Sequence, residues 1–421
     1  MSKIFIYCFL TLLILTAKVY AVSLDEAIFN VSEKNHKILS GQSHIQSILE
    51  DSNISSIVYR PKLTLNSSVG HKQIETTTFS KYSPTSIDFN VKQTIFDGYK
   101  GRYLMQKAKE EFYKAEFEQS LLEQSIFLDT IKAYIDLLHY DKLLKLNNEN
   151  KIILGEELES SSFQFSLGDI KRSDLLLAEA KYNKAIFDIS DIEKIIINLS
   201  TVFINLTEMK PVDLTVPVIK YNSLPASLNE AILIANTEHP RILLNQHVIN
   251  SANLDTKIIE SEKFPQLNLN ANYSNDWNSL STIKRSKTLS ILGSISIPLY
   301  DSGLINSKLR KSSLLENKFK LNALHTQNEV IENITNNWNL LESLKDSLSS
   351  ENNFLLVNIE ILKAIDEERK NGISSNLDFL NAQNSVIQSK IRLSKYQFDQ
   401  LYYSYKLLNS IGRLNLKSLL S

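Results

Sequence analysis

The chain has 421 residues, of which 43% are hydrophobic, with 46 basic and 47 acidic side chains. This near-neutral balance argues against a nucleic-acid-binding protein, which would carry a basic stripe or patch. The sequence contains only 10 Gly and 8 Pro, and few helix breakers predict long uninterrupted elements. The length suits two ordinary domains or one large elongated domain.

Residues 1–21 are typical of a signal peptide. Lys3 supplies a positive charge, Ile4–Leu15 is apolar, and Val19-Tyr20-Ala21 offers small residues for cleavage after Ala21. The alternative is a membrane anchor, but about 12 apolar residues are too few to cross ~30 Å of hydrocarbon as a helix. The only cysteine, Cys8, lies in this run. The mature chain is therefore predicted to lack disulfides, thiolate metal sites and cysteine nucleophiles.

The rest of the chain is an internal repeat, in which the pattern that begins at Leu24 recurs from Leu228 at a constant offset of 204 residues. Pro61, Gly168 and Asp174 recur in step as Pro265, Gly372 and Asp378. Composition alone would not keep Pro, Gly and Asp in register, so we interpret the pattern as a tandem repeat. We expect a first repeat over 22–210, a proline-rich linker over 211–225 and a second repeat over 226–421.

Each repeat is predicted to begin with a helix and continue into two strands. The helices are expected over Leu24–Val58 and Leu228–Lys263, and the proline that follows each one stops it. The strands are expected at about 62–70 and 86–96 in the first repeat, and about 266–274 and 287–298 in the second. Apolar and polar residues alternate along them, as in a sheet with one apolar face.

These strands can be interpreted in two ways. A soluble sheet with one solvent-exposed face would show the same alternation. Each strand, however, has the length that a tilted strand needs to cross a bilayer, about 9–11 residues. No later segment has about 18 consecutive apolar residues, so insertion into a membrane would require a closed barrel. Four strands enclose too little space for a pore, so several subunits would have to contribute strands.

Two very long helices are predicted next, each followed by a return helix. Gly98–Ser166 and Gly303–Asn371 are 69 residues each and contain no proline; a continuous helix of that size reaches roughly 100 Å. The return helices are expected at about 170–208 and 374–412. Apolar residues recur at the spacing of a coiled-coil seam. A filament-type coiled-coil rod is the alternative, although it needs neither a signal peptide nor paired amphipathic strands.

The sequence resembles the TolC family of outer-membrane factors over residues 22–421. Val91–Gly98 and Ser294–Gly303 are similar to the family's strand-to-helix exits. Phe165–Gly168 with Ser173-Asp174, and Asn371-Gly372 with Leu377-Asp378, are similar to its two helix-hairpin tips. The resemblance implies an α+β membrane protein, a homotrimer in which four strands per subunit close a 12-stranded β-barrel in the outer membrane. A periplasmic α-helical tunnel continues the barrel.

The resemblance also implies a function and partners. The trimer would be a passive export duct across the outer membrane and the periplasm, in a tripartite efflux or type I secretion system. It would sit in outer-membrane lipid and dock a periplasmic adaptor (membrane fusion) protein, which links it to an inner-membrane pump or ABC exporter. The predicted adaptor-docking tips are Leu167, Gly168 and Asp169 in the first hairpin, and Asn371, Gly372 and Ile373 in the second.

A periplasmic gate is implied as well. Asp378 matches one position of the family's acidic ring, but Asn381 occupies the second position, so the ring should be weaker. Ser173 and Asp174 match the side that receives the gate contacts, and the usual Tyr and Arg partners are replaced by Arg369 and Ser374. Our hypothesis is that Arg369 pairs with Asp174. The alternative is that Arg369 belongs to a solvated helix end.

No motif points to catalysis. The seven His residues form no zinc-type pair with a nearby Glu, and no phosphate loop or nucleophile elbow appears. We therefore predict no enzyme, no cofactor, no metal site and no nucleic-acid partner. Two other classes stay open: a periplasmic adaptor, which would need a Gly-rich lipoyl-like domain that is not visible, and a structural coiled-coil protein of the envelope.

Overall fold

The computed structural model describes residues 22–75, 79–218, 224–280 and 282–420, so the predicted signal peptide and Cys8 lie outside the described residues. The chain forms two compact units. One takes the residues up to Leu39, Leu122–Ala235 and those from Val330 onward, and the other takes Ser40–Leu121 and Asn236–Glu329. Each unit therefore contains parts of both repeats, because the two long helices contribute residues to both units.

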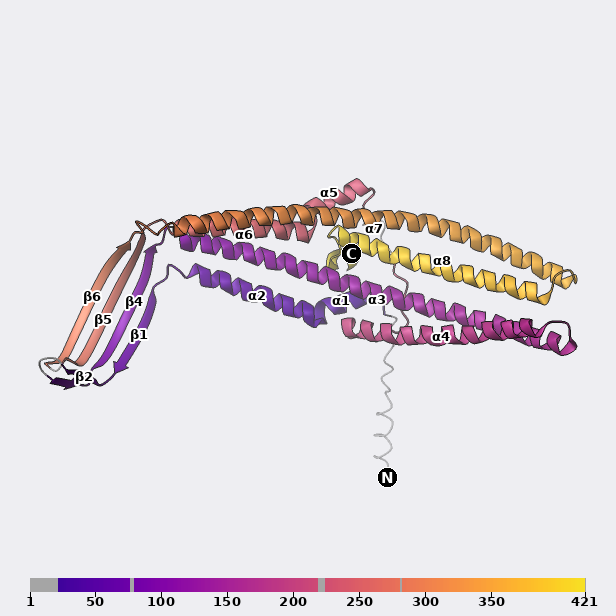
Figure 1. Ribbon diagram of the computed structural model, residues 1–421, viewed down its shortest axis with the longest axis horizontal. Helices are drawn as coiled ribbons and strands as arrows, with labels where there is room; N and C mark the ends of the chain where they lie inside the picture. The colour runs from indigo at the N-terminus through magenta and orange to yellow at the C-terminus, as the bar shows by residue number, and fades with distance from the viewer. Residues whose placement is uncertain (1–21, 76–78, 219–223, 281, 421) are drawn as a thin grey trace, which may run out of the picture. The chain divides into compact units, whose positions relative to one another are not determined.

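The elements follow in chain order, and most of them are labelled in Figure 1. They are α1 (Leu24–Lys34), α2 (His36–Ser56), β1 (Lys62–Val69), β2 (Lys72–Glu75), β3 (Phe79–Tyr82), β4 (Thr85–Phe96), α3 (Lys100–Leu167), α4 (Arg172–Thr207), α5 (Leu228–Glu238), α6 (Pro240–Ser261), β5 (Gln266–Leu280), β6 (Ile283–Ser296), α7 (Leu304–Lys370), α8 (Asn376–Ser410) and α9 (Leu416–Leu420). Within the described residues, no helix contains a stretch long and apolar enough to cross a membrane.

The opening helix of each repeat is broken, where the sequence predicted one helix over Leu24–Val58 and another over Leu228–Lys263. Asn35 is extended (φ −63°, ψ 119°) and its Oδ1 accepts a hydrogen bond from the Lys37 N–H. His239 is also extended, and its Nδ1 accepts from the Arg241 N–H at 3.1 Å. Both residues act as N-caps for a second helix, which explains the breaks.

His239 should make stability depend on pH. Burial, together with the charge of Arg241, lowers the pKa of His239 to about 4. The ordinary value in an unfolded chain is about 6.5. Between these values the unfolded chain binds a proton at His239 that the folded chain does not. The contribution of His239 to the free energy of unfolding is therefore intact above about pH 6.5 and is lost as pH falls toward 4.

His239→Asn should remove that dependence, because Asn caps a helix without titrating. We expect the free energy of unfolding of the parent to fall relative to the variant by up to about 3 kcal/mol on acidification. Urea unfolding at pH 7.5, 6.0 and 4.5 measures the difference. Parallel pH profiles for the two proteins would contradict this role for His239.

The four long strands form one antiparallel sheet in the order β1-β4-β5-β6. Residues paired across it share a face, so Leu63, Val91, Ala271 and Ile291 form one transverse row, and Leu65, Phe89, Tyr273 and Leu289 the next. The opposite face carries Asn90, Asn272 and Ser290 in a row. The predicted amphipathic alternation is thus confirmed along most of the sheet. Departures from it include Leu292, which lies on the polar face, and Gln93, which pairs with Leu269 on the apolar face.

Two parts of the sheet differ from the sequence-based expectation. The polar loop expected between β1 and β4 contains a separate hairpin, in which β2 pairs with β3. Strands β5 and β6 are longer than expected and run almost into each other, with Leu280 paired to Ile283. Polar residues such as Asn275 and Arg285 extend these strands because a ladder needs only backbone groups, which any residue except proline supplies in full.

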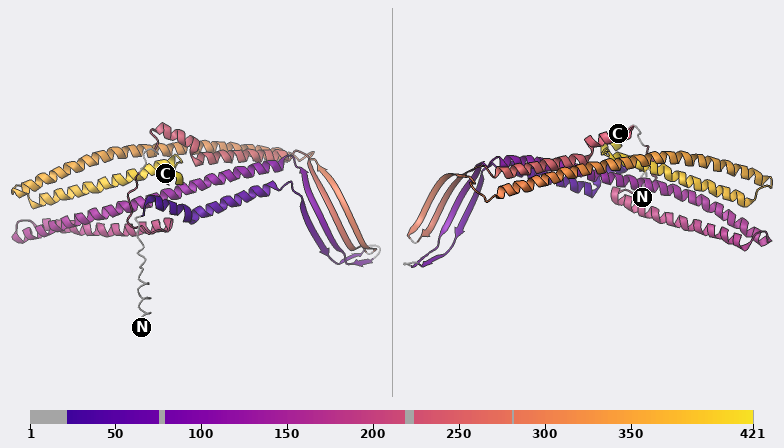
Figure 2. Two further views of the ribbon diagram at one scale, coloured as in Figure 1. Left: turned by 180° about the vertical axis from the view of Figure 1, so that it is seen from behind. Right: turned by 45° about the horizontal axis from the view of Figure 1, so that its top comes forward.

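In the first unit, α3 runs beside α4 and α7 runs beside α8, and the views in Figures 1 and 2 agree on both pairs. The coiled-coil positions predicted from sequence include buried ones: Ala185, Ile192 and Phe203 on α4, and Ile334 and Leu341 on α7. Apolar side chains at these positions pack between helices and keep the hairpins closed.

Tyr134 on α3 holds two non-helical segments, at Val22 and at Thr215, against the packed helices. It is fully buried, its hydroxyl lies 2.8 Å from the carbonyl oxygens of both Val22 and Thr215, and it accepts a hydrogen bond from the Thr215 N–H. Burial raises the pKa of this hydroxyl above its ordinary value. The segment around Thr215, in the predicted linker, is thereby tied to α3 without regular secondary structure.

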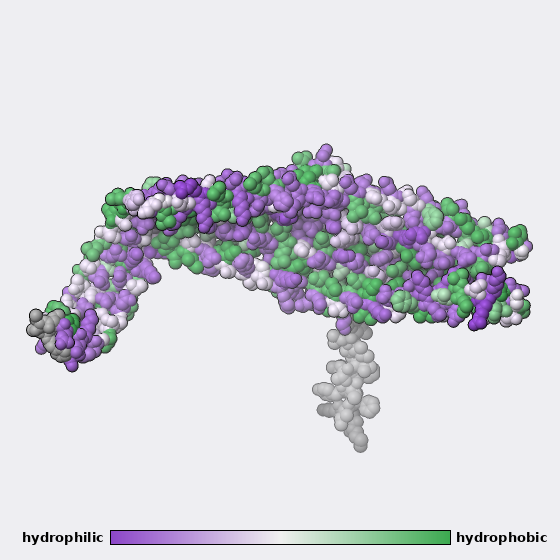
Figure 3. Space-filling model, in the orientation of Figure 1, coloured by the Kyte–Doolittle hydropathy of each residue, from purple (hydrophilic) through white to green (hydrophobic). Residues whose placement is uncertain are grey.

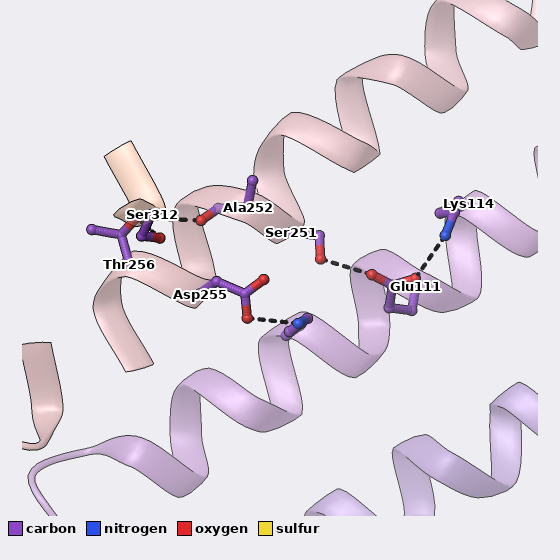
Figure 4. Close-up of polar contacts among 8 residues, drawn as sticks. Glu111, Lys114, Ser251, Ala252, Asp255, Thr256 and Ser312 are labelled. Atoms are coloured by element: carbon purple, nitrogen blue, oxygen red, sulfur yellow. Dashed lines mark hydrogen bonds and ion pairs between the residues drawn. The ribbon is translucent and has the colours of Figure 1, made fainter. Parts of the chain in front are cut away.

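In the second unit, polar contacts join α3 to α6 (Figure 4). Ser251 donates a hydrogen bond to Glu111 at 2.7 Å, and Lys107 lies 2.6 Å from Asp255. Burial opposes the charge on Glu111, but the Ser251 hydroxyl and the Lys114 ammonium outweigh it and hold the pKa of Glu111 below its usual range. These side chains fix how α3 and α6 are aligned along each other.

Candidate functional sites: the sheet and the hairpin tips

The apolar face of the sheet is open to its surroundings. Leu63, Leu289 and Ile291 are each 66–72% exposed, although a soluble sheet would bury such a row against a second layer. An apolar sheet face of this extent is typical of a surface that meets lipid or another apolar partner.

The first hairpin tip is a tight reversal between α3 and α4. Gly168 has φ +83°, and the Asp169 N–H donates to the Gln164 carbonyl, so the last carbonyls of α3 are satisfied as in a Schellman motif. Asp174 caps α4, since its carboxylate accepts from the Lys171 N–H at 3.2 Å, and Ser173 Oγ lies 3.4 Å from its other oxygen. The predicted residues Leu167, Gly168 and Asp169 form the reversal itself.

The second tip repeats this design between α7 and α8. Gly372 has φ +72°, and the Ile373 N–H donates to the Glu368 carbonyl at 2.9 Å. Ser375 and Asp378 form a capping box, in which Asp378 accepts from the Ser375 N–H and the Ser375 Oγ accepts from the Asp378 N–H. Hydrogen bonds from Ser375 lower the pKa of Asp378 below its ordinary value. Asp378 therefore keeps its negative charge at this helix start.

Both tips expose large apolar side chains. Ile373 is 76% exposed and Leu167 60% exposed, and Phe163, Leu176 and Leu177 nearby are also exposed. In Figure 3, hydrophobic residues (green) reach the surface around the ends of the hairpins. Clustered apolar side chains at a solvent-facing turn indicate a protein contact surface.

Arg369 is held by its own hairpin. Its Nη2 lies 2.7 Å from Asp366, its Nη1 donates to Asn376 Oδ1 at 3.4 Å, and its guanidinium stacks over the Phe379 ring at 4.2 Å. The end of α7 is thereby tied to the start of α8. Asp174 is engaged in the cap of α4, so each of the two residues of the hypothetical lock has a local partner within the subunit.

Three partners of the predicted gate were missed from the sequence: Asp366, Asn376 and Phe379. Asp366 precedes Arg369 by three residues, which is a spacing that favours ion pairs on a helix. Asn376 also donates to Ser160 of α3 at 3.2 Å, which connects the two hairpins. Asn381 is exposed on α8, one turn after Asp378. Among the described residues, no group of His, Cys, Asp and Glu is arranged to hold a metal ion.

Comparison with known proteins finds similarity to outer-membrane proteins in each case. A family model described as "Outer membrane efflux protein" matches residues 232–413. The outer membrane efflux protein BepC of Brucella suis biovar 1 (strain 1330) is 24% identical over 393 residues, which cover 93% of this chain and 86% of BepC. The outer membrane protein TolC of Salmonella enteritidis is 20% identical over 359 residues, which cover 80% of this chain and 71% of TolC.

The fold is that of solved outer-membrane channels. The crystal structure of the Campylobacter jejuni CmeC outer membrane channel superimposes with a TM-score of 0.82 at 16% identity, covering 93% of this chain and 85% of CmeC. At this level of identity the likeness establishes the arrangement of helices and strands.

Proposed function

We propose that the chain belongs to the TolC-type family of outer membrane efflux proteins, to which it is similar, and that it serves as the outer-membrane duct of an export system. It lies in the cell outer membrane and extends into the periplasm, as the sequence predicted. Because its relatives are channels, we propose that it catalyses no reaction, so the energy for export must come from a partner.

The exposed apolar face of the four-stranded sheet carries this proposal. Its edge strands, β1 and β6, are unpaired on their outer sides within the sheet, and an unpaired edge in hydrocarbon costs several kcal/mol per backbone group. A lone subunit has too few strands to enclose water. We propose that three copies join β1 to β6 of the next subunit, which closes a 12-stranded barrel with Asn90, Asn272 and Ser290 facing the lumen.

Conductance across a planar lipid bilayer tests the duct. Purified mature protein should insert and give discrete ohmic channel events, and the polar lumen should pass small ions of both signs. Ion-tight bilayers after repeated additions of folded protein would refute the channel and would favour a structural coiled-coil protein.

We propose that the hairpin tips dock a periplasmic adaptor, which links the duct to an inner-membrane pump or ABC exporter. A photo-crosslinking residue at Asn371 should capture such an adaptor in intact cells. Ile373→Glu should reduce capture about tenfold or more, because it puts a charge where an apolar side chain is buried on docking. Ile373→Val, which keeps the surface apolar, should crosslink normally; equal yields from both variants would argue against docking at this tip.

We propose that Arg369, Asp174 and Asp378, with Asn381 and Ser173, form the periplasmic constriction. Arg369→Ala removes the contacts to Asp366, Asn376 and Phe379 that hold the end of α7 against α8, as well as any contact to Asp174 in the trimer. The variant should conduct more in planar bilayers than the parent. Asp174→Asn separates the two contributions: if the lock includes Asp174, this change should raise conductance too. Unchanged conductance in Arg369→Ala would contradict the gate.

A further inference from the structure

The apolar face of the sheet changes character at the end where the strands are joined by loops. Beyond the row of Leu65, Phe89, Tyr273 and Leu289, the next two rows end in cations on β6: Asn275 pairs with Lys287, and Trp277 pairs with Arg285. Directly paired residues share a face, so Trp277, Arg285 and Lys287 lie on the same side as the apolar rows. We refer to these three residues as the basic patch.

The basic patch has a defined geometry. The Arg285 guanidinium lies 5.5 Å from the centroid of the Trp277 ring, and its Nε donates to Asn275 Oδ1 at 3.3 Å. These contacts orient the guanidinium plane and engage only one of its nitrogens. In the described residues, neither Arg285 nor Lys287 forms an ion pair with a carboxylate. The patch therefore presents two uncompensated positive charges.

The patch is confined to one end of the sheet. Along the apolar face of the four strands, Arg285 and Lys287 are the cations, and both lie near the turn between β5 and β6. Lys62 pairs with Lys92 near the opposite end, where the chain continues into helix, but both belong to the polar face. A merely solubilising set of charges would have no reason to gather on the apolar side of one end.

We propose that the basic patch binds a phosphorylated headgroup of the outer-leaflet lipid. The inference rests on the proposed function, which places the apolar rows in hydrocarbon and the strand-joining loops outward. The Trp277 indole then lies at headgroup level, where such rings are enriched. The phosphate is held between the guanidinium and the ammonium by charge-assisted hydrogen bonds. The acyl chains run along Tyr273, Leu289 and Ile291.

The test uses full-length mature trimers in a neutral detergent. Binding is measured by native mass spectrometry with diphosphorylated lipid A and with the same lipid A after removal of its phosphates. The parent should prefer the phosphorylated lipid by about tenfold. The double variant Arg285→Gln/Lys287→Gln should lose the preference. The matched control Lys92→Gln/Lys284→Gln removes the same charge from the other face, because side chains alternate along a strand, and should keep it.

Four results would overturn the proposal: equal binding of both lipids by the parent, an undiminished preference in Arg285→Gln/Lys287→Gln, loss of the preference in the control, or saturation of the patch by inorganic phosphate alone, which would assign it to a free anion. Conductance distinguishes this failure from failure of the proposed function. Parent trimers that conduct but do not select phosphate refute only the lipid site, whereas protein that neither binds lipid nor conducts refutes both.

Discussion

Replacement of Ile291 by Lys should abolish assembly of the chain in the outer membrane. Ile291 lies in the central part of β6, is 68% exposed, and shares its row with Leu63, Val91 and Ala271. A Lys on the lipid face near the bilayer midplane costs about 2–4 kcal/mol. Since each trimer would contain three copies, the combined penalty is comparable with the whole stability of an ordinary domain.

Ser290→Lys is the matched control, because Ser290 precedes Ile291 on the same strand but lies in the row of Asn90 and Asn272 on the polar face. A lysine there meets water in the proposed lumen. The measurement is the amount of heat-resistant trimer in the outer-membrane fraction of cells that express each variant. Loss of trimer with Ile291→Lys but not with Ser290→Lys is expected. Equal amounts from both variants would mean that the apolar face does not meet lipid.

Replacement of Lys181 by Met should strongly destabilise the first hairpin. Lys181 Nζ on α4 lies 2.8 Å from Glu157 on α3, and the Glu157 side chain is only 4% exposed. Removal of one partner leaves a buried carboxylate without compensation, which typically costs about 3–5 kcal/mol. Met keeps the length and the apolar stem of lysine, so the loss reports the charge contact. Thermal unfolding of detergent-solubilised protein, followed by circular dichroism, measures the effect.

Lys184→Met provides the comparison on the same helix. Lys184 lies 3.4 Å from Asp188, but its side chain is 76% exposed. Exposed pairs contribute at most about 1 kcal/mol, so this variant should unfold close to the parent. If Lys181→Met and Lys184→Met shift the unfolding temperature equally, the Glu157–Lys181 contact has no special role between α3 and α4.

The sequence was informative where periodicity and chain breakers act locally. Alternation along β1 and β4 predicted an amphipathic sheet, and glycines at the same place in each repeat predicted the hairpin tips, because Gly168 and Gly372 take positive φ values that other residues adopt at a cost. The break at His239 was missed, because one helix was predicted over Leu228–Lys263, although Pro240 at the first position of α6 is a local signal for a new helix.

Other features depend on contacts that no local pattern encodes. The break at Asn35 was missed because Asn is tolerated within helices, and only its side-chain bond to the Lys37 N–H makes it a cap. The adjoining ends of β5 and β6 were missed because polar residues such as Asn275 and Arg285 are typical of a loop. The contacts of Arg369 with Asn376 and Phe379 arise only once the turn brings α7 and α8 together.

The most direct test of the central claim is a disulfide between the edge strands of neighbouring subunits. Cys8, in the predicted signal peptide, is the only cysteine in the sequence, so introduced pairs can be scored without background. Thr64 or Asn66 on β1 is replaced by Cys together with Ser290 or Thr288 on β6, in all four combinations. A Cys pair at Asn90 and Asn272, which face each other within one sheet, is the control.

If three subunits close one barrel, at least one edge pair should give covalent trimers from outer membranes on oxidation, and a reductant should return them to monomers. The control pair should crosslink only within a chain. Monomers alone from every edge pair, with the control pair oxidised, would show that β1 and β6 do not meet between subunits and would contradict the shared barrel.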